Sequence, residues 1–317
     1  MMAGHHPPPL RDSMRIALRA PVRSSLARAF MALGLLSILI LATAPAAFAD
    51  FIAPDAGSGS PNAEGIRSLY LIIYVLAVII FVGVGGLLLF TLRRFSAKRH
   101  PVAEQIHGNN KLEIGWTLGA ALLLVVISIV TFAKLDGIDN PPNSGAEGAP
   151  VTEQGSFIAD GARRPMPPNG KSLNIQVNGQ QYMWRYVYAD GDKDLLNNVF
   201  AYETMVVPVN TTVTLTIRSN DVQHSWWVPD LGGKFDAVPG YTNYTWFKAT
   251  KTGTFRGQCA ELCGRNHANM VAQVKVVEPA AFEAWYARQK QNIEGANKLA
   301  AAGRQALAAQ AAQTSAK

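Results

Sequence analysis

Two long apolar stretches that carry no charge place the strongest constraint on how this chain can fold. They are SLYLIIYVLAVIIFVGVGGLLLFTL over residues 68–92 and IGWTLGAALLLVVISIVTFA over residues 114–133. Each reaches the roughly twenty residues that a helix needs to cross the hydrocarbon core of a bilayer. The composition agrees, because 49% hydrophobic and 16% charged residues is too apolar for an ordinary soluble protein. We therefore expect two transmembrane helices within a membrane region over residues 50–135.

The polar segment between the two stretches predicts their orientation. Its charged residues are mostly basic: Arg93, Arg94, Lys98, Arg99 and Lys111 against Glu104 and Glu113. Because cytoplasmic loops are rich in Lys and Arg, this loop is expected in the cytoplasm, and everything after Lys134 outside. Residues 1–49 end in an apolar run and Ala47-Phe48-Ala49, a pattern typical of a cleaved signal peptide. An uncleaved membrane anchor is the alternative for this segment.

The exported region begins with a Pro-, Gly- and Ser-rich connector over residues 136–170 and then changes pattern. Apolar residues alternate with polar ones in SLNIQVN, TTVTLTIRS and NMVAQVKVV, which is typical of half-buried strands. Residues 171–290 are thus expected to form a compact antiparallel sandwich or barrel. The Ala- and Gln-rich residues 291–317 are expected to form a loosely ordered tail after a surface helix.

The formal net charge of +7 does not indicate nucleic-acid binding. The basic excess lies in the N-terminal segment and the cytoplasmic loop, where it serves targeting and topology. The large polar region has no run of Lys or Arg interleaved with aromatic residues. We expect a lipid bilayer as a partner and no nucleic acid.

The segment GQCAELCGRNHANM, residues 257–270, holds both cysteines of the chain. His267 and Met270 follow them, and the remaining histidine of the exported region, His224, opens the segment HSWWVP. Thiolate and thioether ligands beside imidazole favour copper, whereas Zn²⁺ in a Cys2His2 site would leave the methionine without a purpose. A disulfide is the remaining alternative, but closing so short a loop removes little unfolded-chain entropy. The sequence therefore favours a metal site.

HSWWVP followed by GQCAELCGRNHANM resembles the dinuclear copper A site of subunit II of the haem-copper cytochrome c oxidases. The resemblance covers about residues 68–285. It implies a two-helix transmembrane hairpin followed by an all-β cupredoxin-like Greek-key barrel or sandwich, in a bacterial inner membrane with the C-terminal domain on the periplasmic side. It also implies a function, which is to accept electrons from cytochrome c and pass them to haem in the catalytic subunit. That subunit reduces oxygen to water and pumps protons, while this chain alone only transfers electrons.

The resemblance assigns a ligand set for two copper ions. Cys259 and Cys263 would bridge both ions, and His224 and His267 would bind one each. Met270 and the backbone carbonyl of Glu261 would be weak axial ligands. The side chain of Glu261 would help to bind a magnesium ion shared with the catalytic subunit.

The resemblance also implies roles for residues outside the copper loop. Trp184 would receive the electron from cytochrome c, with Tyr182 and Met183 in place of two aromatics that usually precede it. Glu113 would lie at the entrance of a proton pathway. Acidic residues would attract cytochrome c, and two further residues would contact the catalytic subunit, beside which other oxidase subunits are expected. The acidic residues are Asp190, Asp192 and Asp221, and the contact residues are Lys234 and Asp236.

Four other functions fit the sequence less well. A quinol oxidase subunit lacks the copper ligands that this chain has, and nitrous oxide reductase is a longer soluble protein. A nitric oxide reductase with a copper A subunit is harder to separate from the sequence alone. A membrane-tethered copper carrier would leave Glu113, Trp184 and Glu261 without a joint explanation.

Overall fold

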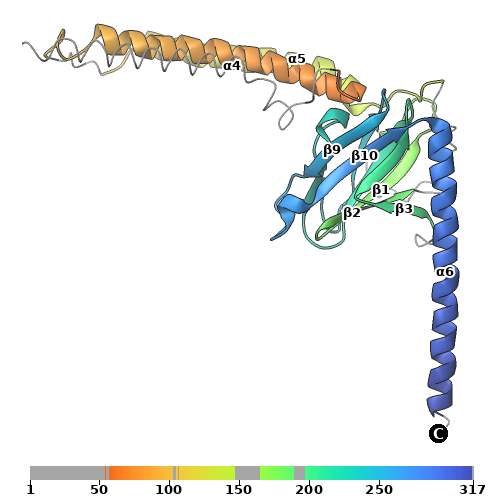
Figure 1. Cartoon of the computed structure of the whole chain (residues 1–317). Coiled ribbons are helices and arrows are strands. Elements are labelled where there is room, and N and C mark those ends of the chain that lie inside the picture. Colours follow the sequence, from red (N-terminus) through yellow and green to blue (C-terminus); the bar gives the residue numbers. More distant parts are fainter. Residues whose placement is uncertain are drawn as a thin grey trace, which may run out of the picture. The chain divides into compact units, whose positions relative to one another are not determined.

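The computed structural model describes residues 54, 57–102, 105, 107–146, 165–188 and 197–315. The expected signal peptide, most of the connector, and the predicted docking residues Asp190 and Asp192 lie outside the described residues. The described part comprises a helical hairpin, a β-sandwich and a C-terminal helix (Figure 1).

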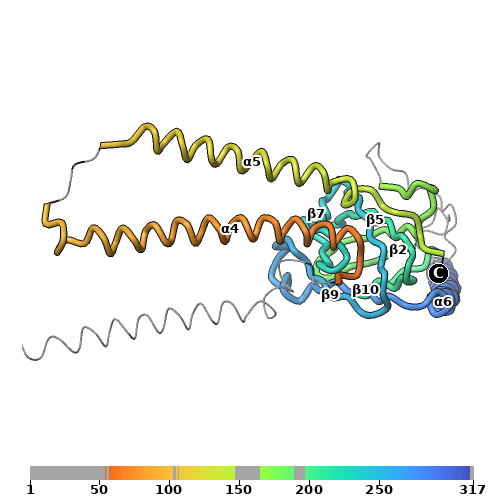
Figure 2. The backbone as a smooth tube through the Cα atoms, turned by 90° about the horizontal axis from the view of Figure 1, so that it is seen from above, coloured from red at the N-terminus to blue at the C-terminus, as the bar shows by residue number. Residues whose placement is uncertain are grey.

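The hairpin consists of α4 (Pro61–Arg94) and α5 (Asn110–Asp139), which run side by side in opposite directions (Figure 2). Both helices are longer than the predicted spans because capping residues outside the apolar runs start them. Pro61 occupies the first turn of α4, and the side chain of Asn109 accepts a hydrogen bond of 3.2 Å from the Leu112 N–H at the start of α5. Both are long and apolar enough to cross a membrane. The apolar stretch of each helix is not buried against other described parts of the protein.

Hydrogen bonds join the ends of the hairpin to strand β8 (Asn243–Lys248). The indole N–H of Trp246 donates to the carbonyls of Ile138 and Asp139 at 2.9 and 3.0 Å, which satisfies carbonyls that the end of α5 leaves free. The Asn62 side chain in the first turn of α4 donates to the Trp246 carbonyl at 2.8 Å. One strand residue thus contacts both helices.

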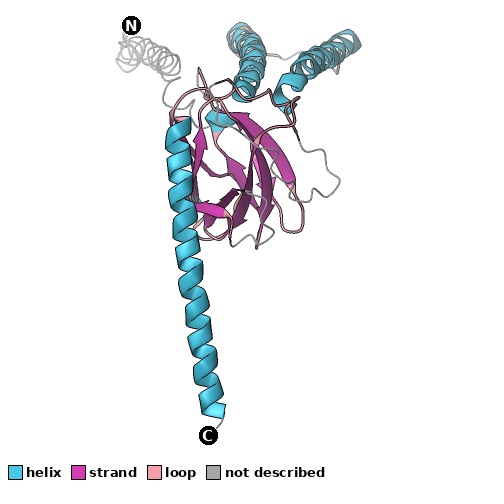
Figure 3. Ribbon diagram, turned by 90° about the vertical axis from the view of Figure 1, so that its right-hand side faces the viewer, coloured by secondary structure: helices cyan, strands magenta, loops and turns pink. Residues whose placement is uncertain are grey.

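Two five-stranded sheets form the sandwich (Figure 3). The first has the order β3-β2-β1-β5-β8, and the second has the order β4-β10-β9-β6-β7. The bounds of the first sheet's remaining strands are β1 Leu173–Gln180, β2 Met183–Tyr188, β3 Val199–Tyr202 and β5 Thr212–Ser219. Those of the second are β4 Thr204–Pro208, β6 His224–Trp227, β7 Phe235–Ala237, β9 Gly253–Cys259 and β10 Val271–Val277.

The sheets are mixed rather than purely antiparallel, which differs from the sequence-based expectation. β1 pairs with β5 in parallel, and β4 pairs with β10 in parallel. The chain changes sheet between β3 and β4 and again between β4 and β5, so β5 returns beside β1 in the same direction. This crossing between sheets places strands that are distant in sequence side by side.

The core lies between the two sheets, and most apolar residues of the alternating segments are buried in it. Burial alternates along β10 as predicted, whereas the polar residues of β1 and β5, such as Asn174 and Thr214, are buried too, so these two strands are not half-buried. Ile175 and Val177 of β1 and Val274 of β10 are fully buried. The Tyr188 hydroxyl donates to the Val206 carbonyl at 2.8 Å and accepts from its N–H at 2.7 Å, which links β2 to β4. The sandwich is therefore joined by both apolar packing and cross-sheet hydrogen bonds.

The C-terminal helix α6 runs without interruption from Pro279 to Ser315 (Figures 1 and 3). Its first half packs on the sandwich, where Phe282 and Ile293 are buried and the Trp285 ring lies 5.1 Å from that of Tyr188. The predicted change at residue 291 falls inside this helix, and the expected loose tail is helical as far as Ser315. Its many alanines explain the difference, because alanine has the highest helix propensity.

Candidate metal centre

The predicted ligands come from neighbouring strands of the second sheet and from the loop that joins two of them. His224 is the first residue of β6, and Cys259 is the last residue of the adjacent strand β9. Cys263 lies in the following loop, and Met270 directly precedes β10. The Cys259 N–H donates to the Met270 carbonyl at 2.9 Å, so the two ends of the loop are held together.

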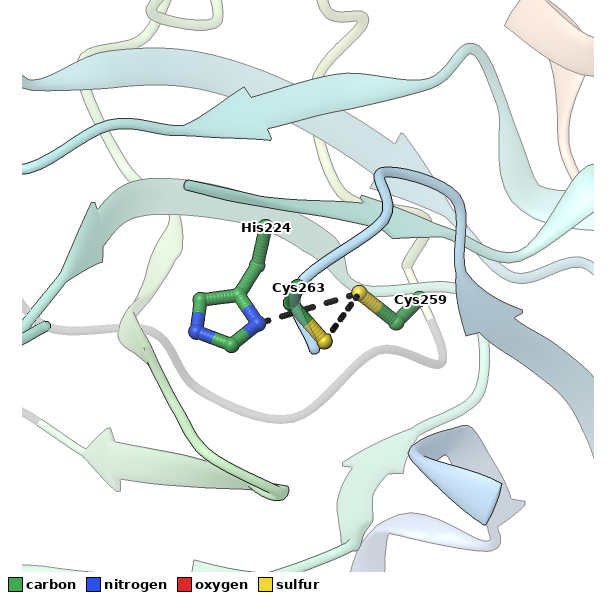
Figure 4. A group of neighbouring side chains, drawn as sticks. All are labelled: His224, Cys259 and Cys263. Carbon is green, nitrogen blue, oxygen red and sulfur yellow. Dashed lines mark hydrogen bonds between the residues drawn. The ribbon is translucent and has the colours of Figure 1, made fainter. Parts of the chain in front are cut away.

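The donor atoms converge around the two sulfurs (Figure 4). The Sγ atoms of Cys259 and Cys263 are 3.9 Å apart, far beyond the length of a disulfide bond, and both cysteines are free. Cys259 Sγ lies 3.8 Å from His224 Nδ1, and Cys263 Sγ lies 3.6 Å from the Nδ1 atom of His267. Two further donors complete the set, namely the Met270 Sδ at 3.9 Å from Cys263 Sγ and the Glu261 carbonyl at 3.3 Å from Cys259 Sγ.

The protein environment distinguishes the two thiols. Burial opposes ionisation of Cys259, but hydrogen bonds with His224 and with backbone groups outweigh it and lower the pKa to about 6. Burial, followed by the charge of Cys259, raises the pKa of Cys263 to about 11. The metal-free site therefore favours ionisation of Cys259 over that of Cys263, and a bound cation would stabilise both thiolates.

Asp221 orients the imidazole ring of His224. Its Oδ1 lies 2.8 Å from His224 Nε2, which leaves Nδ1 facing the sulfurs. The carboxylate also accepts from the N–H groups of Gln181 at 2.7 Å and Val222 at 2.6 Å. Burial raises the pKa of Asp221, but these bonds outweigh it and hold the pKa below its usual range.

The docking role predicted for Asp221 stays a prediction beside this orienting role, because 31% of its side chain is exposed. The sequence signal for the orienting role was the position of Asp221, three residues before the predicted ligand His224.

Trp184 is fully buried, so it cannot contact a docked donor. Strand alternation explains this, because Trp184, Tyr186 and Tyr188 all point into the core from β2. The Trp184 ring lies edge-on at 5.9 Å from the His224 ring. Trp184 as the entrance for the electron stays a prediction, and the electron would have to reach its buried ring through the residues that cover it. Tyr182, two residues earlier, is only partly buried.

The other predicted residues occupy separate places. Glu113 is exposed in the first turn of α5, where its carboxylate accepts from the Asn109 N–H at 3.3 Å. Lys234 and Asp236 form an ion pair of 2.8 Å beside β6, with both side chains partly exposed. The side chain of Glu261 is half-buried within the cysteine loop. Their roles in proton uptake, subunit contact and magnesium binding stay predictions.

Comparison with known proteins matches both parts of the molecule to one family. The model of the cytochrome c oxidase subunit II transmembrane domain matches residues 49–133, and that of the periplasmic domain matches residues 191–277. A probable cytochrome c oxidase subunit 2 from Rickettsia felis is 34% identical over 259 residues, which cover 76% of this chain and 74% of the relative. The chain belongs to the cytochrome c oxidase subunit II family.

Two further relatives illustrate the range of similarity to this subunit II chain. Cytochrome c oxidase subunit 2 of Cereibacter sphaeroides is 33% identical, over 72% of this chain and 77% of the relative. The crystal structure of the periplasmic domain of subunit II from Bradyrhizobium japonicum is 37% identical, over 38% of this chain and 95% of that one, with a TM-score of 0.35.

Membership of the subunit II family explains why a membrane hairpin and a metal-binding loop occur in one chain. The chain is a membrane subunit of an oxidoreductase complex, and its exported domain corresponds to the family's periplasmic domain. The donor set of two thiols, two imidazoles and a thioether fits copper, because these are soft and borderline ligands. It does not suit Mg²⁺ or Ca²⁺, which prefer oxygen ligands.

Proposed function

We propose that this chain is the subunit through which electrons enter a cytochrome c oxidase. It accepts electrons from cytochrome c at a dinuclear copper centre and passes them to haem in the catalytic subunit. There, oxygen is reduced to water and protons are pumped. One observation carries the proposal: two thiols lie 3.9 Å apart, and each has its own imidazole within 3.8 Å.

The described residues supply a complete ligand set for this centre. Cys259 and Cys263 would hold both metals through their thiolates, His224 and His267 would each bind one copper, and two weaker donors would complete the set. The weaker donors are the Met270 thioether and the Glu261 carbonyl. The two coppers would supply a site that gains and loses one electron at a time. The chain buries the sulfurs and fixes their positions between two strands, which limits structural change as the charge of the site changes.

The remaining assignments concern partners and location. We place the subunit in a bacterial inner membrane, with lipid around α4 and α5 and the copper domain in the periplasm. The basic residues that end α4 support this orientation. Glu261 would share a magnesium ion with the catalytic subunit, Lys234 and Asp236 would contact that subunit, and Glu113 would lead into a proton pathway. Asp190, Asp192 and Asp221 would steer cytochrome c electrostatically.

The experiment that tests this proposal separates electron entrance from later steps. The oxidase is purified through a tag on this chain, as wild type and with Cys263→Ser. Turnover is measured with reduced cytochrome c and with a small reductant that reduces the haem of the catalytic subunit directly. We expect Cys263→Ser to lower the cytochrome c rate by about 100-fold or more and to leave the direct rate unchanged. Removing a residue that only hydrogen-bonds to a metal ligand typically lowers activity by about 10- to 100-fold, and removing the ligand itself should lower it further.

Asn269→Ala is the matched control for this experiment. Asn269 lies in the same loop, and its amide bonds to Asn266 at 2.6 Å, on the exposed side. This variant should keep both rates. Full cytochrome c turnover in Cys263→Ser would refute the proposed route of electron entrance.

A further inference from the structure

Gln181 bonds to both segments that carry the predicted copper ligands. It lies in the turn between β1 and β2, where these two inner strands of the first sheet end. Its backbone N–H donates to Asp221 Oδ2 at 2.7 Å, and Asp221 in turn holds His224. Its side-chain Nε2 donates to the Cys263 carbonyl at 2.7 Å. A single residue thus links the His224 segment to the cysteine loop.

The cysteine loop is shaped to accept this turn closely. Gly264 has a φ of +134°, a conformation that residues with a side chain rarely adopt. A Cβ atom at this position would lie 2.7 Å from the Tyr182 hydroxyl and 2.8 Å from Gln181 Nε2. Glycine therefore permits the approach of the turn that the Gln181 hydrogen bond requires.

The bond to Gln181 supports the loop at Cys263, between its two anchored ends. The base of the loop is fixed by bonds from the Cys259 N–H to the Met270 carbonyl and from the Ala260 N–H to the Ser225 carbonyl. These bonds lie within the second sheet and its loop, whereas Gln181 reaches Cys263 from the first sheet. The sulfur of Cys263 lies beside three other donor groups, so a shift of its backbone changes several ligand distances together.

We propose that Gln181 is a positioning residue that holds the Cys263 and His224 segments at the spacing copper requires before the metal binds. This inference rests on the proposed copper site. When the loop already holds its ligands in place, copper binding loses less conformational entropy. The Gln181 amide therefore strengthens copper retention. Gln181 itself is exposed, so replacing it alters the loop contact and leaves the buried core intact.

The test uses the full-length chain in detergent, loaded with copper, as wild type and with Gln181→Glu. The substitution keeps the shape of the side chain but turns a carboxylate oxygen toward the Cys263 carbonyl. Copper loss to an excess of chelator is followed over time, and the copper hyperfine splitting is recorded by electron paramagnetic resonance. We expect copper loss to be about threefold to tenfold faster, the range that corresponds to one hydrogen bond of ordinary strength, together with altered splitting.

Gln180→Glu is the matched control, because Gln180 is the preceding residue and bonds to Asn220 at 3.3 Å instead of to the cysteine loop. It should retain copper like the wild type. If Gln181→Glu folds poorly, as judged by circular dichroism, Gln181→Ala removes the amide without adding a charge, and the same acceleration is expected. Equal retention and splitting in the Gln181 and Gln180 variants would overturn this inference alone. A wild-type chain that takes up no copper would overturn the proposed function and this inference together.

Discussion

Asp221 shows how a residue can serve the metal centre without being one of its ligands. Its carboxylate fixes the Nε2 side of His224, and this determines which ring nitrogen faces the sulfurs. The ligand histidine is buried, so its orientation depends on this hydrogen bond rather than on solvent. The pair therefore belongs to the copper centre as a unit.

Replacing Asp221 should weaken copper binding while leaving the ligands in place. We expect Asp221→Asn to lower copper affinity by about tenfold, the lower end of the range for partners of metal-binding histidines. Loss of a negative charge beside the oxidised metal should also raise the midpoint potential. Chelator competition and a redox titration measure the two effects, with Asp236→Asn as the control because Asp236 is paired with Lys234. Identical affinity and potential in the two variants would show that Asp221 has no orienting role.

At the residue scale, short-range spacing predicted that the donor groups of the cysteine loop lie close together, whereas long-range neighbours could not be predicted. Cys259, Cys263, His267 and Met270 lie within twelve residues, so their spacing alone suggested a shared site. The bond from Gln181 to Cys263 joins residues 82 positions apart, and no local pattern reveals it. The burial of Trp184 could be predicted from the alternation along β2, whereas its role as the electron entrance was implied only by the motif.

At the scale of elements, α6 divides into a packed half and an exposed half. Phe282 and Ile293 are buried against the sandwich, whereas Leu299 and Leu307 are 77% and 67% exposed. The exposed half therefore contributes little to the stability of the sandwich, although its alanines favour the helix.

Two changes in α6 should have opposite consequences for stability. Deleting residues 299–317 should leave the free energy of unfolding of the sandwich unchanged, because these residues bury little apolar surface. Phe282→Ala should lower it by about 3 kcal/mol through loss of a buried aromatic side chain. Urea unfolding of the metal-free chain in detergent, followed by tryptophan fluorescence, measures both. A large loss of stability on deletion would show that the exposed half packs on the sandwich.

The sequence predicted the positions of the membrane helices more completely than the arrangement of the strands. The membrane helices were located by their apolar runs, and only their ends moved, because capping residues extend them into polar sequence. The alternation of apolar residues located the strands, but it did not predict which strands pair with each other. Parallel pairing of β1 with β5 depends on where the chain changes sheet, which is a property of the whole domain.

At the scale of the whole molecule, the chain combines a membrane hairpin with an exported sandwich that carries the metal ligands. The hairpin fits a membrane subunit, and contacts from Trp246 and Asn62 connect its ends to β8. The ligands lie on β6, β9 and the loop before β10, so the copper domain belongs to the same chain as its membrane anchor. Family membership in both regions supports a single function for this combination.

The central claim is that the chain holds a dinuclear copper centre, and one measurement tests it most directly. The full-length chain is purified in detergent and loaded with copper, its copper content is determined, and its electron paramagnetic resonance spectrum is recorded. The account predicts two coppers per chain, with hyperfine structure from one unpaired electron shared equally by two copper nuclei. A single copper with a localised spectrum, or bound zinc in its place, would contradict it.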